Sequence, residues 1–392
     1  TDGFQHLGET DLVKILFAEN PAIVIQVLDA DKNLAEDILD AAEVRYFPIA
    51  SPSRQLEKVV TVTHQRQSHF ISIPAMRRVW FEPSYLLDRL QTNPECALQR
   101  RDNLGEQPVN YRLRANFNGI LNSRNLRARR RTSSGMRAAI IREKGVNGDR
   151  EMAYALFLAG FDVRDVHMTD LMSGRETLDD VRMIVFCGGF SNSDVLGSAK
   201  GWASGFRWNE TAKETLRRFY SRPDTLSLGI CNGCQLMVEL GLLNPGGIDS
   251  VIEEKKRVRM DHNISHKFES QFVCLTIPAN NSEMLGSHAG MKLGIWVAHG
   301  EGRFMLPGSL KDYNIAARYN YTAYPANPNG SRGAVAALCS ADGRHLAMMP
   351  HLERAIFPWQ CAFYPDSRRA DDLTPWIDAF VNARKWIEKT TR

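Results

Sequence analysis

The sequence has no apolar run approaching the roughly 18 residues that a membrane-spanning helix needs. Its first ten residues are polar, so they lack the basic segment and apolar core of a secretory leader. The net charge of +4 over 392 residues is too small to create a strong field for nucleic acid or an anionic membrane. We therefore expect neither a membrane nor a nucleic-acid partner.

Cysteine is sparse and irregularly spaced. The seven cysteines form no framework, and their odd number argues against a disulfide scaffold. No second cysteine pair or histidine set stands at the spacing of a zinc site, so we expect no metal. A reducing cytoplasm fits these thiols best.

Length and composition indicate a globular protein with more than one domain. Apolar residues make up 43% and charged residues 24%, an ordinary balance. At about 150 residues per domain, this length suggests two or three units. The chain begins at Thr1 without a methionine, which suggests a piece of something longer, although processing or tag removal would give the same start.

Residues 1–98 are expected to form a first, α+β unit. The β-branched apolar run at 22–28 predicts a buried strand. The other predicted elements are helices at 11–18 and 32–43 and strands at 58–63 and 69–73. This pattern fades after about residue 98, where we place the end of the unit.

Residues 99–135 are polar and rich in asparagine and arginine, which predicts a linker. The arginines that crowd together here are Arg124, Arg127, Arg129, Arg130 and Arg131. One interpretation is a nucleic-acid patch, and the other is a solvated linker lying on an acidic neighbour. The linker is favoured, because no aromatic side chains that stack on bases are interleaved with the arginines.

Residues 136–392 show a different pattern, in which strands and helices alternate. The predicted strands are 137–142, 163–167, 181–187 and 225–230, and the predicted helices are 148–159, 211–220 and 231–240. Alternation of this kind favours a parallel sheet with helices on both faces. We predict an α/β domain with a doubly wound, mostly parallel sheet.

The segment around Cys231 has the pattern strand, G-x-C-x-G, helix, which is the cysteine form of a nucleophile elbow. Gly229 and Gly233 leave room for a strained turn and a close helix. A helix N-terminus favours the thiolate and supplies backbone N–H groups for an oxyanion. The alternatives are a buried structural cysteine or a redox or zinc pair with Cys234.

A thiol nucleophile needs a base and a group that orients the base. His351 and Glu353 follow an apolar strand that ends at Pro350. We expect them on the same side of an extended segment, because they are two residues apart. His351 would take the thiol proton and deliver it to the leaving group, and Glu353 would fix the imidazole tautomer.

Two glycine-rich loops complete the candidate site. Gly188, Gly189 and Phe190 follow a strand directly and can offer N–H donors to an oxyanion, although a phosphate cradle is the competing interpretation. Glu301 lies on the loop His-Gly-Glu-Gly-Arg after a strand at 293–297, where it would hold an α-amino group or simply stand in a solvated turn. Asn232 and Gln235, at the start of the predicted helix after the nucleophile, are the remaining expected substrate contacts.

Several long segments of residues 137–365 resemble the C-terminal glutaminase domain of the large, single-chain type of phosphoribosylformylglycinamidine synthase. They are RAAIIREKGVNGDREMAYALFLAGFDV, GGFSNSDVLGSAKGWA, LGICNGCQLM, HNISHKFES, HGEGRF, YPANPNGSRGAVAALCSADGR and MMPHLER. The resemblance implies a flavodoxin-like class I glutamine amidotransferase fold with its triad on Cys231, His351 and Glu353. These are the residues that the spacing of motifs selects.

The first unit resembles the C-terminal part of the second aminoimidazole-ribonucleotide-synthetase-like (AIR-synthetase-like) half of the same family. The resemblance covers almost the whole chain, but only the last third or so of a family member. It implies that the parts binding ATP and the acceptor lie upstream. ATP and magnesium are thus expected for the full-length synthetase, and no cofactor is expected in this chain. The implied partners are glutamine and the upstream synthetase domains.

The sequence departs from the family pattern at a few positions. Asn192 stands where an aromatic residue is usual, Gln271 replaces an arginine, and Leu352 replaces a proline. Arg100 and Arg101 occupy positions that are usually acidic. Asn192 and Gln271 would weaken glutamine placement or coupling to the synthetase, and Leu352 would relax a turn. We interpret these changes as divergence, because none touches the triad.

The sequence therefore predicts a glutaminase that converts glutamine to glutamate and ammonia. In the family this ammonia serves the ATP-dependent conversion of formylglycinamide ribonucleotide to formylglycinamidine ribonucleotide in purine biosynthesis. Two alternatives remain at this point. One is an amidotransferase that serves another synthetase, and the other is a noncatalytic descendant of the fold that acts as an interaction protein.

Overall fold

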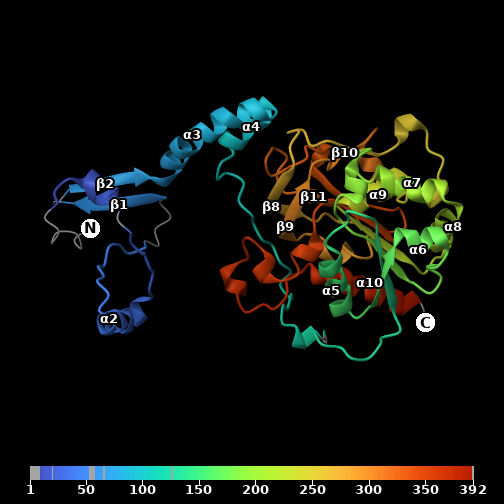
Figure 1. Ribbon diagram of the computed structural model, residues 1–392, viewed down its shortest axis with the longest axis horizontal. Helices are drawn as coiled ribbons and strands as arrows, with labels where there is room; N and C mark the ends of the chain where they lie inside the picture. Colours follow the sequence, from blue (N-terminus) through green and yellow to red (C-terminus); the bar gives the residue numbers. More distant parts are fainter. Residues whose placement is uncertain are drawn as a thin grey trace. The chain divides into compact units, whose positions relative to one another are not determined.

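The computed structural model of the protein describes residues 9–19, 21–52, 58–64, 67–124, 126 and 128–390. The chain forms two compact units, Thr1–Ser84 and Tyr85–Arg392 (Figure 1). Among the described residues, no helix has both the length and the apolar character needed to cross a membrane.

The first unit contains short helices and one hairpin. Its elements are α1 (Leu12–Leu16), α2 (Lys32–Ala41), β1 (Val59–His64), β2 (Gln67–Ser72) and the first part of α3 (Ile73–Gln91). Asp11 caps α1, because its side chain accepts hydrogen bonds from the backbone N–H groups of Val13 and Lys14. β1 and β2 pair antiparallel. The predicted helices and the two later strands of this unit are confirmed.

The predicted buried strand at 22–28 is wrong. These residues form no strand, and Ile23 and Val24 are 91% and 74% exposed. A β-branched apolar run becomes a buried strand only where other strands pair with it and a layer covers it. Among the described residues no strand pairs with this run, so its apolar pattern alone did not determine its structure.

The second unit is built on a large mixed sheet. The strands of that sheet are β3 (Arg137–Arg142), β4 (Asp162–His167), β5 (Met183–Phe186), β6 (Leu226–Ile230), β8 (Glu269–Thr276), β9 (Lys292–His299), β11 (Asn314–Tyr319), β12 (Val335–Cys339) and β13 (His345–Met348), while β7 (Arg259–Asp261) and β10 (Arg303–Met305) pair with each other. Its helices are the end of α3, α4 (Pro94–Asp102), α5 (Asp149–Ala159), α6 (Met168–Ser173), α7 (Lys200–Trp208), α8 (Glu210–Ser221), α9 (Asn232–Leu240) and α10 (Ile377–Thr390).

The sheet changes character halfway across. In the described part of the chain its order is β4-β3-β5-β6-β13-β12-β11-β8-β9, and the pairs from β4 to β13 are parallel. The pairs from β13 to β9 are antiparallel. β5, β6, β12 and β13 are buried along their whole length, as expected for strands covered on both faces. The predicted α/β architecture is confirmed, whereas the antiparallel half was not evident from the sequence.

Helices cover the sheet in two groups. α5 packs against α10, while α6, α7, α8 and α9 pack against one another (Figure 1). α5 ends at Gly160, which adopts a left-handed conformation with φ of 107° and so closes the helix as its position in the sequence predicts.

The arginine-rich segment lies on acidic side chains of the second unit. Arg124 forms an ion pair with Asp378, and Arg130 forms one with Asp162 at 2.7 Å. These two arginines thus lie on acidic neighbours, and the assignment of residues 99–135 as a linker stays a prediction. Arg127 lies outside the described residues.

A partly buried ion network joins α3 and α4 to β8. The Arg100 guanidinium lies 2.6 Å from Asp88 and 3.6 Å from Glu269, and both carboxylates are buried. Tyr324 donates its hydroxyl to Glu269 at 2.9 Å, and Lys267 pairs with Asp88. The arginine that departs from the family pattern thus pairs with two buried acids, one of which it shares with Lys267.

We predict that Arg100→Met destabilises the second unit by roughly 3 kcal/mol, because it leaves the buried Glu269 carboxylate without its cation and Asp88 with Lys267 alone. Arg369→Met is the matched control, since the Arg369–Asp366 pair is about four-fifths exposed and should contribute little. Urea unfolding of both variants measures the difference. Equal losses in the two variants would show that the buried network does not stabilise the fold.

Candidate active site

Cys231 occupies a strained turn between β6 and α9. Its backbone has φ of 52° and ψ of −107°, a conformation that L-residues rarely adopt. The neighbouring glycines are needed for close approach. A Cβ on Gly229 would lie 2.5 Å from the Gly233 oxygen, and one on Gly233 would lie 2.0 Å from the Phe186 oxygen. The predicted strand–elbow–helix geometry is therefore confirmed.

The strand next to β6 brings the candidate base to the nucleophile. β13 pairs parallel with β6, with Met348 opposite Ile230, so the segments after both strands begin at the same edge of the sheet. The Cys231 N–H donates to the Met348 oxygen at 2.9 Å. The His351 N–H donates to the Trp296 oxygen at the same distance, which fixes the backbone of the base.

His351 and Glu353 form a buried pair. Nδ1 of His351 lies 2.7 Å from Oε1 of Glu353, and both side chains are almost fully buried. The sequence predicted this contact from an extended segment that would put both side chains on one side, and that prediction is wrong because the segment is not extended. Leu352–Arg354 form a single 3-10 turn that folds Glu353 back onto the imidazole, and Leu352 is fully buried beneath it.

The charge on His351 is set by its neighbours. Burial lowers its pKa, but Glu353 and Cys231 outweigh burial and raise the pKa to about 9. Nε2 of His351 has no hydrogen-bond partner within the described part of the chain. The Cys231 thiol donates to the Ala298 oxygen at 3.4 Å. A protonated imidazole with a free Nε2 is a suitable proton donor to the leaving group of an intermediate bonded to the sulfur of Cys231.

Gly188 lies against both members of this pair. A Cβ at this position would be 2.8 Å from Cε1 of His351 and 3.2 Å from Cβ of Cys231. Gly189 has φ of 128°, and its Cβ would be 2.6 Å from the backbone nitrogen of Asn147. In the part of the chain that the structure describes, no hydrogen bond occupies the N–H of Gly189 or of Asn232. These two N–H groups are thus available to an incoming oxyanion.

Asn232 and Gln235 are buried and link the glycine loop to the Glu301 loop. The Asn232 amide accepts from Ser191 N–H at 3.1 Å and donates to Gln235 Oε1 at 3.0 Å. Gln235 donates to the Glu301 backbone oxygen at 2.7 Å. Both side chains are therefore engaged with the protein, which favours a role in holding the loops.

Glu301 faces a second carboxylate that the sequence did not single out. Its Oε2 accepts from the Ser198 N–H at 3.2 Å. Asp194 accepts from Asn232 at 3.3 Å and from the Ser198 hydroxyl at 3.2 Å. Burial raises the pKa of Asp194, and the nearby Glu301 also raises it. Asp194 stands within the segment GGFSNSDVLG, which resembles the family. Its place just after the glycine loop was the one feature of the sequence that could have marked it as a site residue.

The remaining predicted contact, Phe190, is half-exposed. It lies beside Phe268 with ring centroids 5.9 Å apart, and so forms an apolar rim. Of the departures from the family pattern, Leu352 lies within the turn that joins His351 to Glu353, whereas Asn192 and Gln271 make no hydrogen bond to these residues among those described. Asn192 has φ of 53° and lies against Gly201, and Gln271 donates to the Pro325 oxygen at 2.7 Å.

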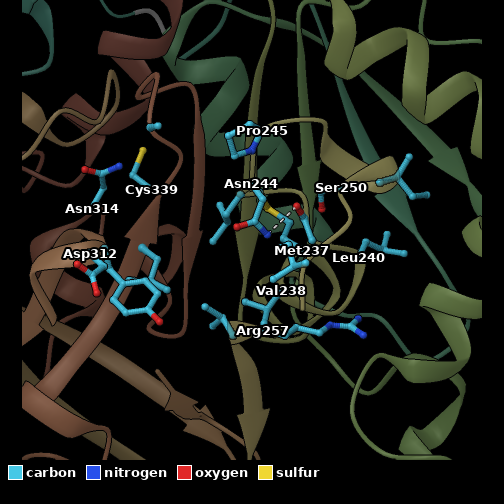
Figure 2. Close-up of a pocket in the computed structure, with 18 of the residues that line it drawn as sticks. Met237, Val238, Leu240, Asn244, Pro245, Ser250, Arg257, Asp312, Asn314 and Cys339 are labelled. Carbon is cyan, nitrogen blue, oxygen red and sulfur yellow. Dashed lines mark hydrogen bonds between the residues drawn. The ribbon is translucent and has the colours of Figure 1, made fainter. Parts of the chain in front are cut away.

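A cavity of about 500 Å³ lies at the C-terminal half of α9, away from Cys231. Figure 2 shows Met237, Val238 and Leu240 of that helix in its wall, with Asp312, Asn314 and Cys339 opposite. No triad residue lines it. Among the described residues, no group of three or more His, Cys, Asp or Glu side chains is placed to hold a metal ion.

Residues 135–387, well over half of the chain, match the family described as CobB/CobQ-like glutamine amidotransferase domain. The chain belongs to this family. It is an enzyme of the glutamine amidotransferase type, and the α/β fold predicted for residues 136–392 agrees with the match.

The resemblance to phosphoribosylformylglycinamidine synthase is also confirmed. The Homo sapiens protein of that name is 38% identical over 401 residues, covering 96% of this chain and 29% of the relative. The "probable phosphoribosylformylglycinamidine synthase, chloroplastic/mitochondrial" of Arabidopsis thaliana is 39% identical over 399 residues, covering 96% of this chain and 27% of the relative. The chain thus spans less than a third of either relative. The structure of PurLQS from Thermotoga maritima is 25% identical with a TM-score of 0.48, over 66% of this chain and 99% of that chain.

We predict that Gly188→Ala lowers the turnover of glutamine by this amidotransferase about 100-fold, because the new methyl group displaces His351 from Cys231. Gly286→Ala is the control, since its Cβ would meet only the Asn280 oxygen at 3.5 Å. Steady-state glutamate release and thermal unfolding are measured for both. A Gly188→Ala enzyme as fast as the control would contradict the tight fit of the histidine.

We also predict a pH-dependent stability that depends on Glu353. The folded-state pKa of His351, about 9, exceeds its ordinary value of 6.5, so the folded protein holds a proton that the unfolded chain releases. This stabilisation is complete below about pH 6.5 and is lost as the pH rises through about 9. Glu353→Gln removes the charge that raises the pKa. The difference in unfolding free energy between wild type and variant should therefore shrink from neutral to alkaline pH. If the two plots of unfolding free energy against pH ran parallel, Glu353 would not be what raises the pKa of His351.

Proposed function

We propose that the protein hydrolyses glutamine to glutamate and ammonia with Cys231 as nucleophile, His351 as acid and base, and Glu353 as the orienting carboxylate. The observation that carries this proposal is the strained elbow that presents Cys231 beside a buried His351–Glu353 pair. A structural cysteine would need neither the positive φ nor the adjacent ion pair.

The proposed reaction starts from an ion pair in which His351 holds the proton given up by Cys231, which leaves Cys231 as the thiolate. The thiolate attacks the carboxamide carbon of glutamine, and the N–H groups of Gly189 and Asn232 hold the resulting oxyanion. His351 then donates its proton to the carboxamide nitrogen, the C–N bond breaks, and ammonia leaves. The glutamyl thioester remains on Cys231. Water, deprotonated by His351, attacks the thioester, so that glutamate leaves and the thiol is restored.

The two acids beside the site suit the other end of glutamine. Glu301 and Asp194 lie close enough for their charges to interact. Among the described residues, the hydrogen bonds that these two carboxylates accept come from neutral donors, not from a lysine or an arginine. We assign them to the α-ammonium group, which would offset the repulsion between the carboxylates. Phe190 would cover the aliphatic part of the substrate.

The ammonia would serve the synthesis of formylglycinamidine ribonucleotide in purine biosynthesis. This part of the proposal is supported by two relatives, each a phosphoribosylformylglycinamidine synthase by name, that align over 96% of the chain. The ATP-dependent step, with its ATP and magnesium, would belong to synthetase domains that partner this chain. The cysteines of the described residues are free thiols, which suits a reducing compartment such as the cytoplasm.

Glutamate release from glutamine by the 392-residue chain tests the proposal. We expect Cys231→Ala to lower the wild-type rate by at least about 1,000-fold, because no thioester can form. Cys361→Ala is the control, since that thiol donates a hydrogen bond to the Phe357 oxygen and takes no part in the proposed triad.

A glutamine-directed affinity label should also modify wild type and Cys361→Ala but not Cys231→Ala. No glutamate release by wild type, even with a synthetase partner and its substrates added, would reject the glutaminase and favour a noncatalytic descendant of the fold.

A further inference from the structure

Asn263 anchors the loop that carries Glu301. The side chain is fully buried, and its amide nitrogen donates to the Lys267 oxygen at 2.9 Å and to the His299 oxygen at 2.7 Å. Its backbone N–H donates to the Gly300 oxygen at 2.8 Å. Because both amide hydrogens are directed to carbonyl oxygens, the orientation of the Asn263 amide is determined, and Oδ1 can only accept.

The orientation of Asn263 determines the tautomer of His299. Oδ1 of Asn263 accepts from the Gly302 N–H at 3.1 Å and lies 3.1 Å from Nδ1 of His299. Nδ1 must therefore carry the hydrogen and donate it. The other ring nitrogen, Nε2, then bears a lone pair and is a hydrogen-bond acceptor.

Nε2 of His299 is buried without a partner. The side chain is 2% exposed, and within the described residues no donor reaches Nε2. Burial and the charge of His351 together lower the pKa of His299 to about 3, so the ring is neutral. Buried acceptors are rarely left unsatisfied, which points to a donor that binds from outside the chain.

His299 is the neighbour in sequence of a residue that contacts Cys231. His299 follows Ala298, whose carbonyl oxygen accepts the Cys231 thiol at 3.4 Å. The charge of His351 also acts on the ring of His299, so the two imidazoles are near enough for their charges to interact. His299 precedes Glu301 by two residues on a loop that Asn263 holds rigidly.

We propose that Nε2 of His299 accepts a hydrogen bond from the carboxamide N–H of glutamine and turns the nitrogen lone pair toward the proton on His351. This inference rests on the proposed glutaminase function. The carboxamide nitrogen is the donor at the reacting carbon, since the oxygen is held by Gly189 and Asn232. The α-ammonium group is better matched to the charged pair of Glu301 and Asp194 than to a neutral ring.

Two substitutions separate the two ring nitrogens of His299. Asparagine keeps a donor near the place of Nδ1, so His299→Asn retains the bond to Asn263 and loses the Nε2 acceptor. Glutamine reaches the place of Nε2, so His299→Gln keeps an acceptor oxygen there and loses the bond to Asn263. Each variant is assayed with glutamine and with glutamate γ-methyl ester, which has no N–H at the reacting carbon.

We expect His299→Asn to lower kcat/KM for glutamine about tenfold, the effect of one hydrogen bond, and to leave the ester within about twofold of wild type. His299→Gln should retain the wild-type ratio of amide to ester rates, even if its melting temperature falls. An equal loss on both substrates in His299→Asn would overturn the proposal in favour of a structural role.

The two proposals fail in different ways. Wild type that hydrolyses neither substrate rejects the glutaminase itself and the inference with it. Wild type that hydrolyses both, together with a His299→Asn variant unchanged on glutamine, rejects only the contact to the carboxamide. If His299→Asn does not fold, the ratio of amide to ester rates in His299→Gln decides: a ratio well below that of wild type would overturn the proposal.

Discussion

The backbone of Cys231 is held in a conformation that costs on the order of 1–3 kcal/mol, and the rest of the site depends on it. β6 makes this possible because it is paired on both sides, with β5 and with β13, so the strand cannot relax at its end. The absence of Cβ atoms at Gly229 and Gly233 allows α9 to begin directly after the nucleophile. The thiol therefore stands at a helix N-terminus, where a backbone N–H is available to an oxyanion.

The pairing of β6 with β13 also explains how distant residues meet. Parallel neighbours end at the same edge of a sheet, so the residues after Ile230 and Met348 lie next to each other. The 3-10 turn after His351 then folds Glu353 under the imidazole. Buried charges of opposite sign stabilise each other only at short range, and the 2.7 Å contact keeps His351 protonated at a depth where burial alone would discharge it.

Much of the second unit could be predicted from the sequence, because its signals are local. The apolar run before Cys231 and the glycines beside it specify a strand, a turn and a helix whatever surrounds them. The run at 22–28 has the same apolar character but forms no strand, since strand formation depends on partners that a local pattern does not reveal. The sequence predicted the contact of His351 with Glu353 correctly but from the wrong geometry. A spacing of two residues brings the side chains together in an extended segment and also in this 3-10 turn.

The sequence by itself determined the chemistry: a cysteine on an elbow, a histidine with a carboxylate two residues on, and glycine loops beside them. Only the tertiary structure placed Asp194 near Glu301 and joined His299 to Asn263. Motifs are contiguous in sequence and can be recognised there. Hydrogen bonds between residues of different loops, and the tautomers and pKa values that follow from them, depend on distances that exist only once the sheet has assembled.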